Sequence, residues 1–256
     1  MTVSNAAYHH PTPLDTRFEA MSLPAMLERT LAANPQAPFL HFLGRTYSYS
    51  QIHKQAEAFA LGLQSIGIVK GDRVGLFLPN VPIYAAAYYG AMMAGAVVVN
   101  FSPLYSVEEL SWQVGDSGTR VLVTLDVPEL YKTAAKVLDG SALETLVVGS
   151  LAEMLPWYKG LALKLLKRSQ IADVAYGPSV KRWAAMTPAG PPRAVDITRC
   201  RFCICRVQGH DYRRQQGCGL CIGRQQPSPG TKWRRSSSGA GTRPRTRANH
   251  NRCHAS

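Results

Sequence analysis

The sequence predicts an α/β fold in which a mostly parallel sheet carries helices on both faces. From residue 39 to residue 148, short apolar runs of strand length alternate with longer amphipathic or Ala-rich stretches of helix length. Residues 74–78 are apolar without alternation, which is typical of a parallel strand buried on both faces. The composition changes abruptly near residue 196, so this prediction concerns residues 20–195.

The first expected elements are a hairpin and an amphipathic helix. Residues 39–49 alternate around Leu43-Gly44-Arg45, which predicts two strands joined by a tight turn. Ser50 is the expected N-cap of the helix, because a serine hydroxyl can accept a hydrogen bond from a backbone N–H of the first turn. Apolar residues then recur every three or four positions until Gly67, where the helix should end: Ile52, Ala56, Phe59, Leu63 and Ile66.

Strands and helices then alternate regularly. Residues 74–78 should form a buried strand, and the Ala-rich residues 83–96 a helix buried against the sheet. Ser106 and Glu109 fit a capping box, in which each side chain accepts a hydrogen bond from a backbone N–H at the start of the helix. The other expected elements are strands at 97–99, 120–125 and 146–148 and a helix at 129–138.

The charge divides the chain into unlike parts. Residues 196–256 hold all six cysteines, 13 of the 29 Lys and Arg residues, and two of the 16 Asp and Glu residues, so they carry +11 of the net charge of +13. They show no apolar periodicity. We therefore expect a polar extension at 1–19, a folded domain at 20–195, and a disordered Arg/Cys-rich tail at 196–256, with no evolved fold from about Arg199 onward.

Several classes of protein are disfavoured. The N-terminus lacks a basic segment leading into an apolar one, so it does not resemble a secretory signal, and we expect a cytoplasmic protein. No cysteine precedes residue 200, which excludes a disulfide framework from the main domain. The longest apolar run, residues 81–101, contains Pro82, tyrosines and glycines, and its change from Ala-rich to Val-rich argues against one membrane-spanning helix.

These elements carry a resemblance to a known family. Residues 71–118, GDRVGLFLPNVPIYAAAYYGAMMAGAVVVNFSPLYSVEELSWQVGDSG, and the upstream YSYSQIHKQAEAFALGLQSIGIVKGDRV resemble the N-terminal subdomain of AMP-forming acyl-CoA synthetases, specifically long-chain fatty-acid–CoA ligases. The resemblance covers about residues 20–195. It implies a partial AMP-binding domain of the adenylate-forming fold, ATP, Mg²⁺ and CoA as cofactors of the full-length family, and a fatty acid as substrate.

The family's phosphate loop, Tyr-Thr-Gly-Gly-Thr-Thr-Gly-x-x-Lys-Gly, is absent from the printed frame after residue 196. However, codons for residues 211–219, read from their second base, permit Thr-Thr-Gly-Val-Ser-Lys-Gly-Ala, which matches the end of that loop. Residues 204–208 read at the other offset permit Leu-Gln-x-Thr-Gly, which would require a second insertion or deletion. The resemblance thus implies a frameshifted tail, with the loop encoded near Asp211, Tyr212, Arg213, Arg214, Gln215, Gln216 and Gly217.

The frameshift predicts a chain without catalytic residues, metal ligands or bound cofactors, and without a nucleic-acid partner. An alternative remains for the tail. Cys200-x2-Cys203 and Cys218-x2-Cys221 are 14 residues apart, close to a zinc-ribbon spacing, and His210 and His250 are available. In that interpretation a ligase-derived fragment binds zinc, and its basic residues, including those at 232–235 and 243–247, bind nucleic acid.

A basic amphipathic segment at residues 155–168 is a candidate for peripheral membrane contact, at the inner face of the membrane. An aromatic residue precedes apolar and basic residues, as in helices that lie on anionic lipid. The alternative is a surface helix packed on its own domain. The candidate residues are Trp157, Lys159, Lys164, Lys167 and Arg168.

Other polar and aromatic residues have structural interpretations that we favour. His41 and His53 lack a neighbouring cluster of Cys, Asp or Glu in the sequence, so we expect satisfied polar residues rather than ligands or bases. Tyr84, Tyr88 and Tyr89 are expected to pack in the core, with an acyl pocket as the alternative. Residues 100–105 are expected to turn the chain after a strand.

Overall fold

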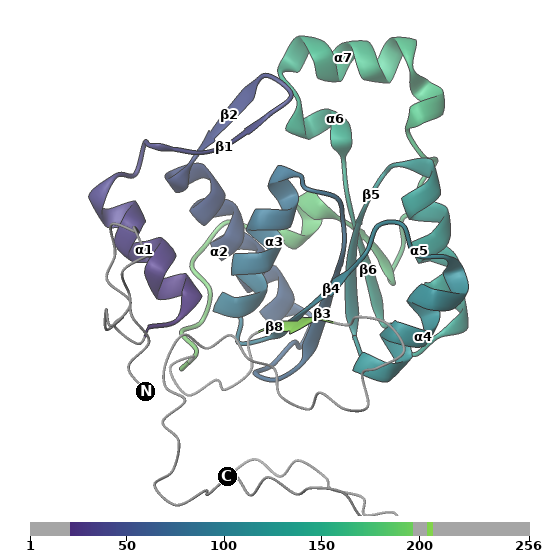
Figure 1. Ribbon diagram of the computed structural model, residues 1–256, viewed down its shortest axis with the longest axis horizontal. Coiled ribbons are helices and arrows are strands. Elements are labelled where there is room, and N and C mark those ends of the chain that lie inside the picture. Colours follow the sequence, from purple (N-terminus) through teal and green to yellow (C-terminus); the bar gives the residue numbers. More distant parts are fainter. Residues whose placement is uncertain (1–20, 197–203, 207–256) are drawn as a thin grey trace, which may run out of the picture. The chain divides into compact units, whose positions relative to one another are not determined.

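The computed structural model describes residues 21–196 and 204–206, and confirms an α/β fold built on a parallel sheet (Figure 1). Its helices are α1 (Leu23–Ala33), α2 (Tyr49–Ser65), α3 (Pro82–Met93), α4 (Val107–Ser117), α5 (Pro128–Gly140), α6 (Leu151–Met154) and α7 (Trp157–Leu166), with 3-10 turns η2 (Arg168–Gln170) and η3 (Trp183–Met186). Its strands are β1 (Pro38–Phe42), β2 (Arg45–Ser48), β3 (Arg73–Phe77), β4 (Val97–Phe101), β5 (Val121–Leu125), β6 (Thr145–Gly149), β7 (Val180–Arg182) and β8 (Ile204–Arg206).

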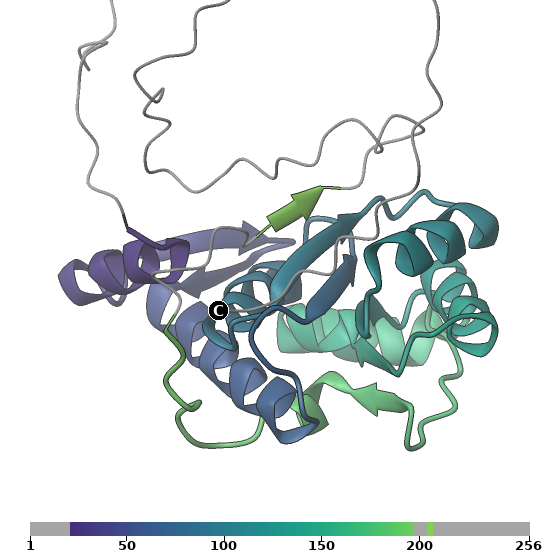
Figure 2. The ribbon, with the colours of Figure 1, turned by 90° about the horizontal axis from the view of Figure 1, so that it is seen from below.

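The main sheet has the strand order β7-β6-β5-β3-β4-β8, and all of its pairings are parallel. Helices α1, α2 and α3 pack together on one face, and α4 and α5 pack on the other (Figures 1 and 2). Strands β5 and β6 are buried along their whole length because both faces are covered. The predicted helices on both faces of the sheet are confirmed.

The predicted hairpin and the first helix are present, with one correction at the helix start. β1 and β2 pair antiparallel, and Leu43 and Gly44 at the turn both have positive φ, +48° and +95°. The N-cap of α2 is Ser48 rather than Ser50. The Ser48 hydroxyl accepts from the N–H of Gln51, whose side chain accepts from the N–H of Ser48. This reciprocal pair outweighs the hydroxyl of Ser50, which lies inside the first turn.

The long apolar run at residues 81–101 is divided, as predicted. It forms α3, a turn at Gly95 with φ +80°, and β4. Helix α3 is apolar nearly all round because it packs between α2 and the sheet. Within the described residues, no helix has both the length and the apolar character that crossing a bilayer requires.

Later helices also follow the sequence pattern. The capping box of α4 is formed by Ser106 and Glu109, and the helix ends at Gly118 in the left-handed conformation. The structure also contains elements that show no clear periodicity in the sequence. These are α1, α6 and β7, together with the two 3-10 turns.

A short strand, β8, lies in the tail. Ile204–Arg206 pair in parallel with β4, and this backbone pairing of three residues leaves the expectation of no evolved fold after about Arg199 a prediction. The outer edge of β4 offers unpaired backbone N–H and C=O groups, and a short extended segment can satisfy them regardless of its side chains. The rest of the tail after Asp196, and the extension at 1–19, lie outside the described residues.

Candidate functional site

The carboxyl end of the parallel sheet is where the fold favours a site. The chain passes from β3 to β4 on one side and then to β5 on the other side of β3. The segments leaving β3 and β5 therefore run in opposite directions, and open parallel sheets bind ligands at such switch points. Of the polar side chains at this end, Asp126 directly follows β5 and Ser150 directly follows β6.

A cavity of about 630 Å³ lies beside these strand ends. Its lining includes Asp126 and Ser150 at the strand ends, Lys164 of α7, Arg168 of η2, and residues 171–174, 176 and 182–184. The Asp126 carboxylate is buried and accepts a hydrogen bond from the N–H of Leu151, at 2.8 Å. This carboxylate therefore fixes the start of α6 and has a structural role.

The wall of the cavity contains an aromatic–cation pair. The Arg182 guanidinium lies 4.1 Å from the centroid of the Tyr176 ring. Burial raises the pKa of the Tyr176 phenol, and the charge of Arg182 partly opposes this rise. The phenol is therefore neutral at physiological pH and can donate a hydrogen bond to a ligand but cannot act as a ready base.

The charges around the cavity are mixed, which decides what it can hold. Three basic side chains, Lys164, Arg168 and Arg182, face three acidic ones, which are Asp126, Glu153 and Asp173. A nucleotide triphosphate needs a cluster of backbone N–H groups and a clear excess of positive charge. Within residues 21–196, no three His, Cys, Asp or Glu side chains are placed to hold a metal ion. The residues that line this cavity therefore lack the excess of positive charge that a triphosphate needs.

Two of the three α3 tyrosines, Tyr84 and Tyr88, pack against the core as predicted, and Tyr84 reaches the sheet edge. The Tyr84 hydroxyl lies 3.0 Å from Oδ1 of Asn100, at the end of β4, and the Tyr84 and Tyr88 rings stack at 6.0 Å. Both rings pack against the hydrophobic core. Tyr89 contacts Phe39 edge to face, at 6.3 Å, and burial raises the pKa of its phenol. This network links α3, β1 and β4 and supports a packing role.

The segment after β4 turns the chain, as expected. The N–H of Leu104 donates to the hydroxyl of Ser102, at 3.3 Å, and the N–H of Tyr105 donates to the carbonyl oxygen of Ser102, at 3.1 Å. Tyr105 packs against the core. The turn thus carries the chain from β4 to α4.

The two histidines differ from each other. Nδ1 of His41 is hydrogen-bonded to the hydroxyl of Thr46 across the hairpin, at 2.8 Å, so His41 is satisfied as predicted. Nδ1 of His53 lies 3.2 Å from the carboxylate of Glu57, one helical turn later. Its Nε2 is buried without a hydrogen-bond partner among the described residues, so the expectation is only half met for His53.

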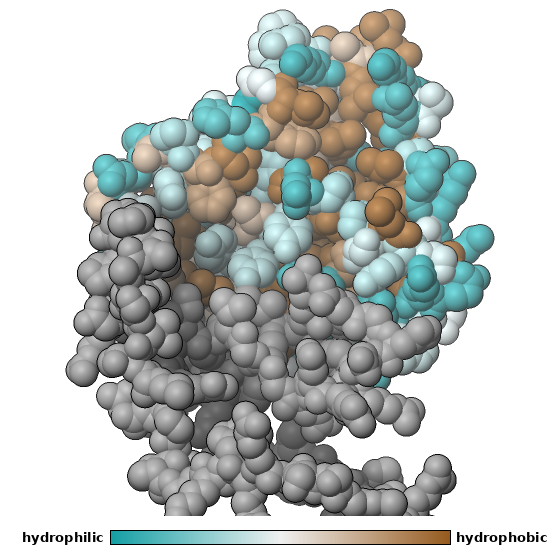
Figure 3. All heavy atoms as spheres, viewed as in Figure 1, coloured by the Kyte–Doolittle hydropathy of each residue, from teal (hydrophilic) through white to brown (hydrophobic). Residues whose placement is uncertain are grey.

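The candidate membrane segment forms α7, which begins after Pro156. Trp157 is 80% exposed. The Lys159 ammonium donates to the carbonyl oxygen of Leu43 in the hairpin turn, at 2.8 Å, and Lys164 and Arg168 also line the cavity. In the space-filling view, hydrophobic residues gather over α7 (Figure 3). The structure thus brings the predicted residues to one end of the sheet.

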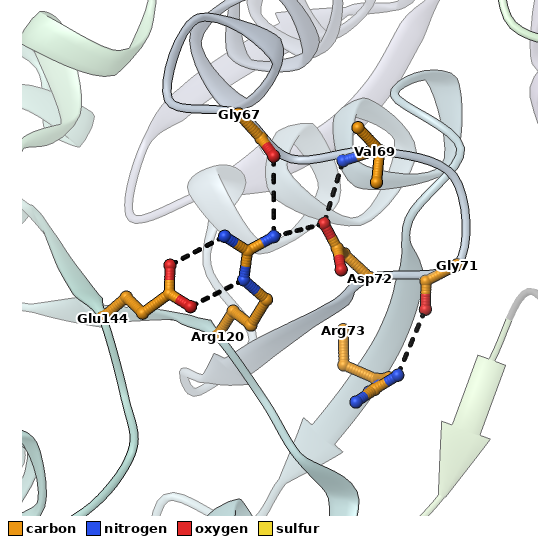
Figure 4. A network of polar contacts seen from close by, with 7 residues as sticks. All are labelled: Gly67, Val69, Gly71, Asp72, Arg73, Arg120 and Glu144. Carbon is orange, nitrogen blue, oxygen red and sulfur yellow. Dashed lines mark hydrogen bonds and ion pairs between the residues drawn. The ribbon is translucent and has the colours of Figure 1, made fainter. Parts of the chain in front are cut away.

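A polar network lies at the opposite, amino end of the sheet (Figure 4). The Arg120 guanidinium donates two hydrogen bonds of 2.8 Å to the Glu144 carboxylate and a third to Asp72. The same Asp72 oxygen accepts from the N–H of Val69. These bonds lower the pKa of Glu144 and raise that of Arg120. The network ties together the segments that precede β3, β5 and β6, which indicates a role in stability.

Sequence reasoning missed three cavity residues, namely Asp126, Tyr176 and Arg182. A signal existed for Asp126, because an acidic residue that directly follows a mostly apolar strand lies at the carboxyl edge of a parallel sheet. Residues 171–184 have no comparable periodicity. The proposed phosphate-loop positions, residues 211–217, and the proposed zinc ligands Cys200, Cys203, His210, Cys218, Cys221 and His250 lie outside the described residues.

Comparison with known proteins gives matches along the folded part of the chain. The model of a family described as AMP-binding enzyme matches residues 27–190. The chain is 31% identical to a long-chain-fatty-acid–CoA ligase of Bacillus subtilis (strain 168) over 166 residues, which are 65% of this chain and 29% of that protein. It is 34% identical over 152 residues to the ligase of the same name from Escherichia coli O6:H1, covering 57% of this chain and 27% of that protein.

Solved structures share the fold. A benzoate CoA ligase from Burkholderia xenovorans LB400 superposes with a TM-score of 0.54 at 17% identity, covering 71% of this chain and 31% of that one. A mutant form of coronafacic acid ligase from Pectobacterium brasiliense also gives 0.54, at 18% identity, covering 68% and 30%. The chain therefore spans less than a third of the length of the relatives it matches.

Proposed function

Because the chain belongs to the family of AMP-binding enzymes, we propose that its folded part is the opening portion of a long-chain fatty-acid–CoA ligase. We further propose that the printed sequence leaves the reading frame of that ligase after about residue 195. The relatives with 31% and 34% identity are named for this activity. The observation that carries the proposal is the match to the end of the phosphate loop at residues 211–218 in the second-base frame.

The complete reaction would have two steps. A fatty-acid carboxylate oxygen attacks the α-phosphorus of ATP, giving acyl-AMP and pyrophosphate. The CoA thiol then attacks the acyl carbon, its proton is lost to solvent or a base, and AMP leaves. ATP and CoA would supply the leaving group and the acceptor, and Mg²⁺ would offset phosphate charge in the first step. The residues of the present chain would contribute the sheet and one wall of the site.

The chain as printed should lack this activity. The Gly- and Thr-rich loop whose N–H groups would hold the phosphates is not encoded in frame, and the cavity at the carboxyl end of the sheet has no net positive charge. We accordingly assign no catalytic residue to it and propose that it binds neither ATP nor CoA. A cytoplasmic location without a nucleic-acid partner is part of the same proposal.

Resequencing the coding DNA for residues 196–219 tests the frame directly. An inserted or missing base would support the proposal, and confirmation of the printed frame in intact relatives would refute it. Catalysis is tested by fatty-acid-dependent exchange of pyrophosphate into ATP. We expect only background exchange from the purified chain and clear exchange from the frame-corrected full-length protein, whereas turnover by the printed chain would contradict the proposed inactivity.

The two CxxC pairs favour a second candidate function, in which a ligase-derived fragment binds zinc and nucleic acid through its tail. A frame change is the better account because it explains the cysteines, the arginines and the missing loop together. Stoichiometric zinc in the purified chain, with salt-dependent DNA binding, would favour the zinc-binding fragment. Loss of these cysteines from the corrected reading frame would eliminate it.

A further inference from the structure

The structure assigns a membrane-docking surface to the outward face of α7 together with the tip of the β1–β2 hairpin, and we propose that its partner is an anionic lipid bilayer. We call this surface the α7 face. Its apolar members, all more than half exposed, are Leu43, Trp157, Tyr158, Leu161, Leu165 and Leu166. The sequence pointed to α7 through its lysines, but the orientation of its leucines comes from the structure.

Helix α7 exposes its apolar side to solvent, whereas an ordinary surface helix exposes its polar side. It rests on the domain through Gly160, which is buried and leaves so little space that an added Cβ would lie 2.5 Å from the carbonyl oxygen of Ala152. Leu163, about one turn further on, is half-buried on the same side. Trp157, Leu161 and Leu165 are spaced four residues apart and point to solvent. A helix that only covers its own domain would bury such residues.

The charges around the α7 face fit anionic lipid. Residues 151–170 carry four basic side chains, Lys159, Lys164, Lys167 and Arg168, and one acidic side chain, Glu153. At 100° per residue, Lys159 and Lys164 fall on opposite borders of the outward apolar stripe. A Trp and several Leu residues bordered by Lys are typical of helices that lie in the plane of a membrane interface, where the apolar face enters the acyl boundary and the cations meet phosphates.

The hairpin turn provides an independent second observation. Leu43 has φ +48° and is 59% exposed. Two-residue hairpin turns favour Asn or Gly at such a position, because a positive φ strains the backbone of a leucine. Exposure of its apolar side chain to water is also unfavourable. Its carbonyl oxygen accepts from Lys159, which places the turn beside the start of α7. A leucine kept in this conformation at an exposed tip is explained if it enters the same bilayer as Trp157.

The proposal does not depend on the proposed ligase activity, because every residue of the α7 face precedes the tail. The tail carries a net charge of +11 and would bind anionic vesicles in every variant. The test therefore compares point variants of the complete chain by co-sedimentation with vesicles of phosphatidylcholine and phosphatidylglycerol. Measurements at about 1 M salt, where the Debye length is about 3 Å, suppress the contribution of the tail.

At about 1 M salt, Leu165→Glu should weaken binding to these vesicles at least about tenfold, because it places a charge where an apolar side chain enters the bilayer. Its matched control is Val69→Glu, which makes the same change of charge at a 63% exposed position near the opposite end of the sheet. The control should bind as the unmodified chain does. Equal binding of the two variants would overturn the proposal.

Leu43→Asn separates docking from folding. Asparagine suits the left-handed turn position, so the variant should melt at the same temperature as the unmodified chain or higher. It should nevertheless bind vesicles about threefold more weakly, since one apolar contact is lost. Unchanged binding by this well-folded variant would remove the hairpin tip from the proposed surface.

Fluorescence quenching by brominated lipids locates the inserted residue. The chain should be quenched on binding, Trp157→Phe should lose most of that quenching, and Trp112→Phe, which alters a 54% exposed tryptophan on α4, should retain it. Size-exclusion chromatography with light scattering tests the other occupant, a second copy of the chain. Self-association that Leu165→Glu abolishes, without any vesicle binding by the unmodified chain, would overturn the lipid proposal.

Discussion

The close approach of α2 and α3 at Gly90 gives the sharpest stability prediction. A Cβ added at Gly90 would lie 2.5 Å from the carbonyl oxygen of Ala56, and 3.1 Å and 3.2 Å from atoms of the Phe59 side chain. Ordinary van der Waals contact starts at 3.4 Å, so the two helices would have to separate by about 0.9 Å at this point. The obstacle is a backbone atom in a helix, which cannot move aside as a side-chain tip can.

Two effects of Gly90→Ala oppose each other. Alanine favours a helix over glycine by about 1 kcal/mol, whereas overpacking a well-filled core typically costs about 1–3 kcal/mol. Because the clash involves the main chain as well as the Phe59 side chain, we expect an overpacking cost of about 2–3 kcal/mol, at the upper end of that range, and hence a net loss of about 1–2 kcal/mol. The matched control is Gly115→Ala on α4, where an added Cβ meets nothing within 4 Å. It should stabilise by about 0.5–1 kcal/mol.

Thermal unfolding followed by circular dichroism measures both variants in the complete chain. A difference of about 2 kcal/mol between them corresponds to roughly 4–8 °C in Tm for a domain of this size. The Gly90 variant should melt below the unmodified chain and the Gly115 variant above it. If Gly90→Ala melts at or above the temperature of the unmodified chain, α2 and α3 do not approach each other at Gly90 as described.

Three further predictions concern the polar network, a helix cap and a second close approach. Hydrogen bonds from Arg120 lower the pKa of Glu144, so this carboxylate adds stability above the ordinary glutamate pKa that is lost as pH falls through the lowered value. Glu144→Gln should therefore lower the free energy of unfolding, measured by urea titration at pH 7, by no more than about 1 kcal/mol. The difference between the variant and the unmodified chain should vanish well below about pH 4, and a difference that does not change with pH would refute the pairing. Ser106→Ala should cost about 1 kcal/mol by the same titration through loss of the α4 cap, and an unchanged midpoint would refute that role. Gly62→Ala should displace η3, because its Cβ would overlap the carbonyl oxygen of Met186, and faster proteolysis of residues 168–196 would show this, whereas unchanged cleavage would contradict it.

The spacing of apolar residues was sufficient to predict the central helices and strands, because the residues that form the apolar stripe of each element also form its contacts with the core. Ile52, Ala56, Phe59 and Leu63 form one stripe of α2, and that stripe is fully buried. The error at its N-cap has a local cause. Ser48 and Ser50 are both acceptable caps by residue type, and the deciding partner is Gln51, three residues after Ser48.

The cavity wall could not be predicted because its placement depends on distant contacts. The Trp183 ring stacks on the Phe59 ring with their centroids 4.6 Å apart, although more than a hundred residues separate them in the sequence. No periodic pattern of apolar residues around Trp183 predicts this contact. The α7 face shows the same limit. Its apolar and basic residues were visible in the sequence, but only the burial of Gly160 reveals which side of the helix faces the domain.

Hydrogen bonds hold the chain on its own domain as far as residue 196. The Gln64 side chain donates to the carbonyl oxygen of Arg193, at 2.9 Å, and accepts from its N–H, at 2.7 Å, and Lys70 donates to the carbonyl oxygen of Asp196, at 2.6 Å. These bonds use the backbone, but their donors and acceptors sit on α2 and on the turn before β3, inside the matched region at 27–190. The chain therefore still follows the surface of its own domain at residue 196.

That position limits where a frame change can lie. If the proposed frame change is present, it falls between the codons of residues 196 and 211, because the codons of residues 211–219 already permit the end of the phosphate loop in the second-base frame. The codons of residues 204–208, which permit Leu-Gln-x-Thr-Gly at the other offset, lie inside this interval and overlap β8, paired with β4. We propose that, under this frame change, the in-frame strand leading to the phosphate loop would pair with the edge of β4 that β8 now occupies. Restoring the frame should therefore replace β8 by that strand and bring the loop to the carboxyl end of the sheet beside β4.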